Sequence, residues 1–164
     1  MNSLIQRKKM PNFISPDDTH YDERSRALVR IGRDAISKAN PSALRAYFSA
    51  DFTFHGPDGE LGFEELESFF SQMRNAFTTY YCERYEIVSA GNLIGCRTEM
   101  GGIFEKPFDL TPIGTVQPHG KQVTLTLINM FRYDEDGRLA EEWVQYDNLE
   151  WLRQLGVELT PASR

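Results

Sequence analysis

Asn129 and Glu142 are the two polar residues in this sequence whose positions best suit chemistry. Each lies in a stretch with strand-like alternation, 121–133 and 138–147, and the turn-forming residues 134–137 separate the two stretches. If Tyr133 pairs with Arg138 in an antiparallel hairpin, Asn129 lies directly opposite Glu142. On the same face this register places Phe131 opposite Ala140, Leu127 opposite Val144, and Leu125 opposite Tyr146.

That face of the predicted hairpin is apolar apart from Asn129 and Glu142. Burial disfavours the charged form of a carboxyl group and raises its pKa, towards the range that suits a general acid or base. We therefore expect Glu142 to act as a base and Asn129 to donate a hydrogen bond to a substrate oxygen. Four neighbours on this face are expected to contact the substrate: Leu127, Phe131, Val144 and Tyr146.

Two other interpretations of this pair stay open. Asn129 and Glu142 could form a structural hydrogen bond that ties the two strands together. Alternatively, a bulge near the turn could shift the register and leave Glu142 on the solvent side.

His55 is a third catalytic candidate. It ends a short predicted strand, 51–55, beside the loop Gly56-Pro57-Asp58-Gly59, and its side chain titrates in the range useful for proton transfer. A lone histidine is more often a packing or surface residue. The sequence has no glycine-rich phosphate loop, no nucleophile elbow and no His-x-x-x-His pair, so we expect neither a cofactor nor a metal.

The order of the predicted elements is typical of an α+β fold. Apolar residues at helical spacing predict helices over 21–39, over a short segment after Asn40-Pro41, and over 63–77. Strands are predicted over 82–90 and 93–104, and a proline-containing loop over 105–120 precedes the hairpin. A short helix near 149–155 closes a domain that we place at 19–158, between a flexible arm (1–18) and a tail (159–164).

The bulk properties exclude several classes of protein. A chain of 164 residues suits one domain, and its formal net charge of −6 argues against binding to nucleic acid. No apolar run approaches the roughly 20 residues of a membrane span, and no export signal is visible, so we expect no membrane partner and a cytoplasmic location. Cys82 and Cys96 are then most simply free thiols.

The second face of the predicted hairpin is also rich in apolar side chains. It presents Ile128, Met130, Leu139 and Trp143, which is a large apolar area to leave in water. We expect this face to form a homodimer about a two-fold axis, although helices or the N-terminal arm could cover it instead.

Several segments resemble the SnoaL-like polyketide cyclase family of the nuclear-transport-factor-2-like superfamily. They run from Tyr21 to Val157 and comprise Asp51-Phe52-Thr53-Phe54-His55-Gly56-Pro57, the helix to Phe77, Thr111-Pro112-Ile113-Gly114, Phe131-Arg132-Tyr133, Asp136 to Trp143, Asp147, and Leu152 to Gly156. The resemblance implies a cone-shaped fold in which three N-terminal helices pack on a curved, mainly antiparallel sheet around a pocket. It also implies an oligomer, commonly a dimer through the outer sheet face.

The resemblance also bears on chemistry. Members of the family include cyclases that close polyketide rings by intramolecular aldol reactions without a cofactor, with an aspartate on the last strand as acid/base. The matching position here is Val144, and Glu142 lies one step along the same face. We expect a cyclase or isomerase that acts by enolisation on a hydrophobic, oxygenated small molecule. The alternatives are a binding or accessory subunit of the same fold and a purely structural dimer.

Overall fold

The computed structural model describes residues 12–158 and residue 160. Within this range the first helices precede two strands, another helix follows them, four more strands come next, and one short helix ends the domain, in the order that the sequence predicted apart from the short second strand. The helices are α1 (Glu23–Arg30), the π-helix η1 (Ile31–Ile36), α2 (Pro41–Tyr47), α3 (Phe63–Ala76) and α4 (Asn148–Gln154). The strands are β1 (Phe48–Gly56), β2 (Gly59–Leu61), β3 (Phe77–Ala90), β4 (Leu93–Phe104), β5 (Gln122–Tyr133) and β6 (Leu139–Tyr146).

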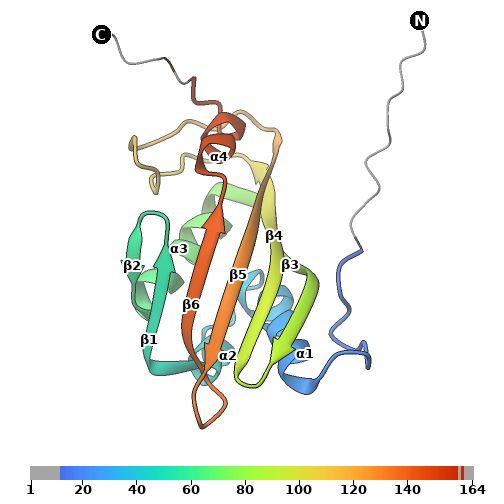
Figure 1. The fold of residues 1–164 in the computed structure, drawn as a ribbon. Helices are drawn as coiled ribbons and strands as arrows, with labels where there is room; N and C mark the ends of the chain where they lie inside the picture. The colour runs from blue at the N-terminus through green and yellow to red at the C-terminus, as the bar shows by residue number, and fades with distance from the viewer. Residues whose placement is uncertain (1–11, 159, 161–164) are drawn as a thin grey trace, which may run out of the picture.

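The six strands form one curved sheet in the order β2-β1-β6-β5-β4-β3. Every neighbouring pair is antiparallel except β1 and β6, which run parallel. In Figure 1 helices α1, α2 and α3 lie behind the sheet, and the opposite face of the sheet is uncovered. The expected α+β class, with its helices on one side of a mainly antiparallel sheet, is confirmed.

The predicted helix over 21–39 is two segments rather than one. Asp22 caps α1 by accepting a hydrogen bond from the Ser25 amide at 2.7 Å, and the helix changes to π geometry at Ile31. Gly32 in η1 lies so close to β3 that a Cβ atom there would be 2.8 Å from the Cys82 carbonyl oxygen. The predicted start of the next helix is confirmed, because Asn40 caps α2 and Pro41 is its first residue.

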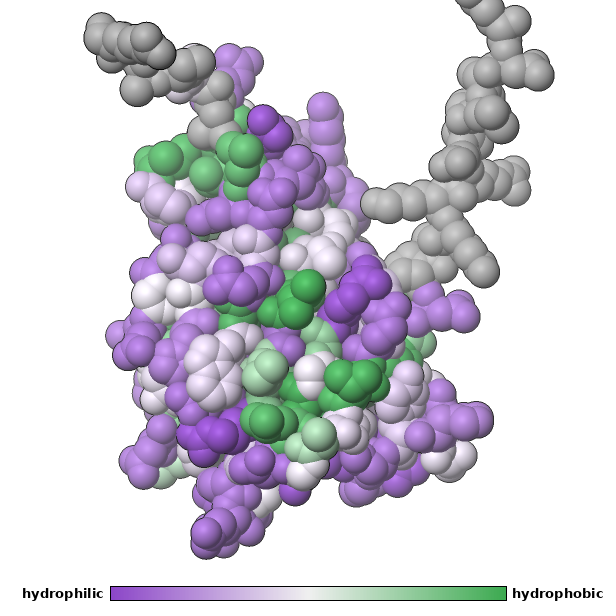
Figure 2. Space-filling model, viewed as in Figure 1, coloured by the Kyte–Doolittle hydropathy of each residue, from purple (hydrophilic) through white to green (hydrophobic). Residues whose placement is uncertain are grey.

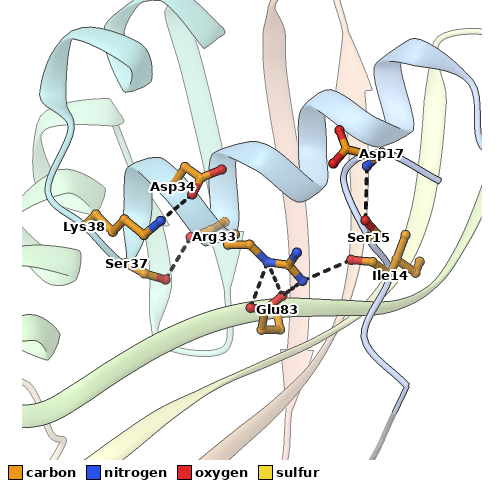
Figure 3. Close-up of polar contacts among 9 residues, drawn as sticks. Ile14, Ser15, Asp17, Arg33, Asp34, Ser37, Lys38 and Glu83 are labelled. Atoms are coloured by element: carbon orange, nitrogen blue, oxygen red, sulfur yellow. Dashed lines mark hydrogen bonds and ion pairs between the residues drawn. The ribbon is translucent and has the colours of Figure 1, made fainter.

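Part of the predicted N-terminal arm is packed against the domain. The Ile14 amide donates a hydrogen bond to the Arg84 carbonyl of β3 at 2.8 Å, and the Ile14 side chain is buried. Figure 3 shows Arg33 of η1 joining this contact: it donates to both carboxylate oxygens of Glu83 and to the Ile14 carbonyl at 3.2 Å. The described part of the arm is therefore held against the domain, because Phe13 packs on Tyr85 of β3 and Ile14 belongs to the hydrophobic core. Residues 1–11, and the tail residues 159 and 161–164, lie outside the described residues.

The register of the β5–β6 hairpin differs from the prediction by two residues. Asn129 pairs with Val144, and Phe131 pairs with Glu142. The turn accounts for one residue, because Asp134 rather than Tyr133 pairs with Arg138, and Gly137 takes a φ of +77°. A shift between Arg132 and Tyr133 leaves Ala140 as an extra residue in β6 and accounts for the other.

This two-residue shift preserves the predicted faces from Glu141 onwards, because side chains alternate with a period of two along a strand. It does not preserve the face of Leu139, which comes before the extra residue. Leu139 is opposite Tyr133, and both side chains are buried. The prediction that Leu139 belongs to the outer apolar face is wrong.

The outer face of the sheet does expose the other three apolar residues. Ile128 is 64% exposed, Met130 49% and Trp143 37%. Figure 2 shows hydrophobic side chains gathered at the middle of the face that the sheet presents, with hydrophilic ones around them. No helix within residues 12–158 combines the length and the apolar character that crossing a membrane requires.

Candidate functional site

A cavity of about 760 Å³ lies between the inner face of the sheet and the helices. Its wall is mostly apolar, with Leu28, Ile31 and Ile36 from the helices facing Leu125 and Leu127 from β5. Exposed lining residues mark its mouth, which is formed by the β1–β2 turn, by α3 and by the loop after β4: Asp58, Gly59, Ser68, Asp109, Leu110 and Pro112. This size and lining suit a hydrophobic small molecule.

A chain of four polar side chains crosses the sheet from β3 to β6, and three of them, Arg84, Asn129 and Glu142, line the cavity. Arg84 donates to the Thr98 hydroxyl, and Thr98 donates to Asn129 Oδ1 at 2.6 Å. Asn129 Nδ2 in turn donates to Glu142 Oε1 at 2.7 Å. All four residues are buried. Every hydrogen bond in the chain points towards Glu142, so Thr98 sets the orientation of the Asn129 amide that holds the carboxyl group.

Glu142 has the properties of an acid/base group. It is 7% exposed, and burial raises its pKa from 4.5 to about 7, although the Arg84 charge and the Asn129 hydrogen bond both act to lower it. The carboxyl group is therefore partly ionised near neutral pH, where it can accept a proton and return it. The expectation of a bulge that exposes Glu142 is not met, since the bulge leaves this residue inside.

The four predicted substrate-contacting residues all line the cavity. Leu127, Phe131 and Val144 are buried on the same sheet face as Asn129 and Glu142. Tyr146 lies nearer the mouth, where its hydroxyl donates to Asp58 Oδ2 at 3.0 Å and burial raises its pKa. The predicted set therefore belongs to the lining of one cavity.

His55 does not join this group. In the parallel pairing of β1 with β6, Phe54 is level with Glu142 and His55 is level with Trp143, so His55 lies on the outer face. Its ring stacks on Trp143 and hydrogen-bonds to Glu60 at 2.9 Å and to Glu141 at 2.8 Å. The Glu141 contact raises the His55 pKa. The alternation along β1 turns this histidine away from the cavity.

Sequence reasoning missed Arg84, which lines the cavity, and Thr98, which is fully buried and links Arg84 to Asn129. Arg84 lies in a segment that was predicted as a strand, where it alternates with Glu83 and Tyr85. Residues 83–86 are Glu-Arg-Tyr-Glu, so both faces of this strand carry polar side chains, and the pattern does not show which of them faces the core. Cys82 and Cys96 are free, as expected, and the structure shows that both are buried. Burial raises the Cys82 pKa to about 11, so this thiol is a poor nucleophile.

The model of the SnoaL-like polyketide cyclases matches residues 26–155 of this chain, which is most of its length. The chain belongs to the SnoaL-like polyketide cyclase family. No protein of curated function matches it significantly in sequence. The family membership and the cavity agree with the fold that the sequence segments implied.

Several solved structures share the nuclear-transport-factor-2-like fold of this chain. AclR, a candidate hydroxylase from Streptomyces galilaeus, is 20% identical, with a TM-score of 0.68 and 85% of each chain covered. IdmH, a candidate polyketide cyclase from Streptomyces antibioticus, is 23% identical, with a TM-score of 0.65, and is covered completely by 83% of this chain.

A third related structure holds a ligand. A protein with a ketosteroid isomerase-like fold from Catenulispora acidiphila, in complex with trimethylamine, is 17% identical, with a TM-score of 0.61 over 85% of this chain and 98% of that one. At these identities the likeness establishes the fold and leaves the reaction open.

Within the SnoaL-like family the position expected to carry the acid/base aspartate corresponds to Val144. This residue is 2% exposed and lies directly opposite Asn129. Valine cannot transfer a proton, and the carboxyl group of this cavity is two residues earlier, at Glu142. Because residues two apart share a strand face, Glu142 reaches the same cavity from a different point on its wall.

Proposed function

We propose that this protein is a cofactor-independent acid/base enzyme that enolises a hydrophobic, oxygenated small molecule in its cavity, as a cyclase or isomerase does. The observation that carries the proposal is the Asn129–Glu142 hydrogen bond of 2.7 Å inside an apolar cavity. Glu142 is the base. Asn129 holds Glu142 with one amide N–H and has a second for the substrate oxygen.

The proposed steps balance without another reactant. The Glu142 carboxylate takes a proton from the carbon next to a substrate carbonyl, and the electron pair of that C–H bond forms the enolate. The second Asn129 N–H stabilises the enolate oxygen. In an isomerisation the protonated Glu142 returns the proton to another carbon of the enolate. In a ring closure the enolate carbon attacks a second carbonyl, and Glu142 protonates the resulting alkoxide.

Exchange of α-protons tests the base without knowledge of the natural substrate. A panel of bicyclic aromatic ketones in D₂O, followed by proton NMR, reports enolisation directly. We expect Glu142→Gln to lower the exchange rate by about 10²–10⁴-fold, the usual contribution of a general base. The wild-type rate should rise with pH through about 7 and then level, as Glu142 ionises.

Glu141→Gln is the matched control for this experiment. Glu141 is the neighbouring carboxylate, but it lies on the outer face, where Arg132 and His55 bind it. Its variant should exchange at the wild-type rate. If Glu142→Gln also exchanges at that rate, Glu142 is not the base.

A non-catalytic binding subunit is the second candidate. Val144 favours it, because the family position expected to hold the acid/base aspartate carries no titratable group here. For a binding subunit we expect ligands to bind in the cavity of the wild-type protein, and no enzyme-dependent proton exchange across the ketone panel.

We also propose that the partner of this chain is a second copy of itself. Ile128, Met130 and Trp143 form an exposed apolar cluster on the outer face of the sheet, next to the Arg132–Glu141 ion pair. Pairing this face with its copy would bury the apolar side chains at the centre and leave charged ones at the rim. The cavity lies on the other side of the sheet and would stay open to substrate.

A further inference from the structure

Arg84 is a buried cation in the wall of the cavity. Its side chain projects from β3, is 4% exposed, and lines the same space as Glu142. None of the ion pairs among residues 12–158 includes Arg84. Burial of a charge is costly unless a partner compensates for it. A buried arginine without a carboxylate partner therefore requires an explanation.

Most of the hydrogen-bonding capacity of Arg84 is unused within the described residues. A guanidinium group has five N–H donors. One nitrogen, Nη1, donates to the Thr98 hydroxyl, while Nε is buried without a partner. The Phe131 ring covers one face of the group, with its centroid 5.4 Å from the guanidinium carbon. These contacts hold the guanidinium in place and leave donors available.

Glu142 does not neutralise this cation by direct contact. The two side chains are connected through Thr98 and Asn129, which are both neutral. The carboxyl group is also only partly ionised near neutral pH, so the buried part of the cavity wall keeps much of the positive charge of Arg84. The other carboxylates of the lining, Asp58, Glu65 and Asp109, are exposed. In an apolar enclosure the Arg84 charge attracts an anion more strongly than it would in water.

We propose that Arg84 binds the carboxylate of an otherwise hydrophobic ligand, which makes the substrate of the proposed function an apolar carboxylic acid. That this acid is also the substrate rests on the proposed function, whereas the binding of a carboxylate by Arg84 does not. Arginine suits this task because its N–H donors match the two oxygens of a carboxylate. The cavity volume of about 760 Å³ leaves room for a bicyclic or larger skeleton against the leucine and isoleucine side chains.

A pair of matched probes tests the proposal by calorimetric titration. 2-Naphthoate and 2-naphthamide have the same ring system and nearly the same size, and only the first is an anion. We expect wild-type protein to bind the naphthoate at least 10-fold more tightly than the amide. Equal affinities in the wild type would overturn the proposal without any variant.

Substitution of Arg84 locates the preference. Arg84→Met should bring the naphthoate-to-naphthamide affinity ratio close to one and leave the affinity for the amide nearly unchanged. Arg84→Gln keeps a donor for Thr98 and should lose the preference in the same way, which provides a second variant if the first does not fold. Arg97→Met is the control, because Arg97 lies on the exposed face of β4, where it pairs with Glu86. A preference for naphthoate that persists in both Arg84 variants would overturn the proposal.

The anion site and the proposed base can fail independently of each other. Glu142→Gln removes a negative charge from the cavity and keeps Arg84, so this variant should bind the naphthoate at least as tightly as the wild type. Wild-type proton exchange in Glu142→Gln would contradict the base and leave the anion site standing. Loss of the naphthoate preference in Glu142→Gln would instead contradict the anion site.

Discussion

At the scale of single residues, Glu142 combines two properties that oppose each other. Burial makes its ionised form unfavourable, while Asn129 and the more distant Arg84 favour that form. Because burial dominates, ionisation of Glu142 destabilises the folded protein. In the proposed function this carboxyl group transfers a proton, and the raised pKa that suits it to that task comes at a cost in stability.

We therefore expect a pH-dependent contribution of Glu142 to the free energy of unfolding. Its pKa is 4.5 when exposed and about 7 in the folded protein, so the folded state binds more protons between these values. Below pH 4.5 Glu142 is protonated in both states, and its contribution to stability is fully present. As pH rises to about 7, the free energy of unfolding falls by about 3 kcal/mol because the unfolded state ionises first. Urea unfolding of wild type and Glu142→Gln at a series of pH values measures it.

The difference in stability between the wild type and Glu142→Gln separates the effect of Glu142 from that of the other titrating groups. Several carboxylates outside the cavity, such as Asp22 and Glu141, have lowered pKa values and shift stability in the opposite direction at low pH. They occur in both proteins and cancel in the comparison. Relative to the wild type, Glu142→Gln should gain stability between pH 4.5 and 7. A difference that does not change with pH would show that Glu142 is not perturbed.

At the scale of elements, η1 and β3 are packed unusually closely beside the polar chain. Gly32 makes this approach possible, and the space for a side chain there is occupied by the Cys82 carbonyl and the Cys82 thiol. The same helix carries Arg33, which fixes Glu83 and the Ile14 backbone on the edge of β3 (Figure 3). These contacts fix the strand from which Arg84 projects.

Gly32→Ala should destabilise the protein by about 1–3 kcal/mol, the usual cost of overpacking. The new Cβ atom would lie 2.8 Å from the Cys82 carbonyl oxygen, so the backbone of η1 or β3 must move. This cost should outweigh the helix propensity of alanine, which alone favours the variant by about 1 kcal/mol. Urea or thermal unfolding measures the change.

Gly62→Ala is the matched control for that substitution. Gly62 is the N-cap of α3 at a negative φ, and a Cβ atom there would meet only Glu65 Oε2 at 3.6 Å. Its effect should stay below about 1 kcal/mol. If Gly32→Ala is as stable as the wild type, the close contact between η1 and β3 does not limit this position.

At the scale of the whole molecule, the sheet separates two surfaces of different composition. The inner face carries the cavity and the polar chain, and the outer face carries Ile128, Met130 and Trp143. The outer cluster continues across the sheet to His55, which stacks on Trp143 and is held by Glu141. This arrangement gives His55 a role in shaping the outer surface.

We expect light scattering to give a mass close to twice the chain mass of 18.9 kDa at micromolar concentration. Trp143→Glu should dissociate the dimer, because it places a charge within the buried apolar area. Leu149→Glu is the control, since Leu149 is 48% exposed but lies on α4. A wild-type mass near 18.9 kDa, or a Trp143→Glu dimer as stable as the wild type, would contradict this interface.

The sequence by itself determined the order of the elements and the two faces of the β5–β6 hairpin. Strand alternation depends only on neighbouring residues, so Asn129, Glu142, Leu127 and Val144 were assigned to one face before their partners were known. The assignment of these four residues held even though the register was two residues off, because a shift by an even number keeps the side chains from Glu141 onwards on their predicted faces.

Only the tertiary structure decided which residues meet across strands. The extra residue at Ala140 turned Leu139 inward, and the parallel pairing of β1 with β6 put His55 beside Trp143 rather than Glu142. The antiparallel pairing of β3 with β4 and of β4 with β5 brought Arg84 and Thr98 into line with Asn129. Such contacts join residues that are far apart in the chain. They depend on bulges and strand order, which local residue patterns do not reveal.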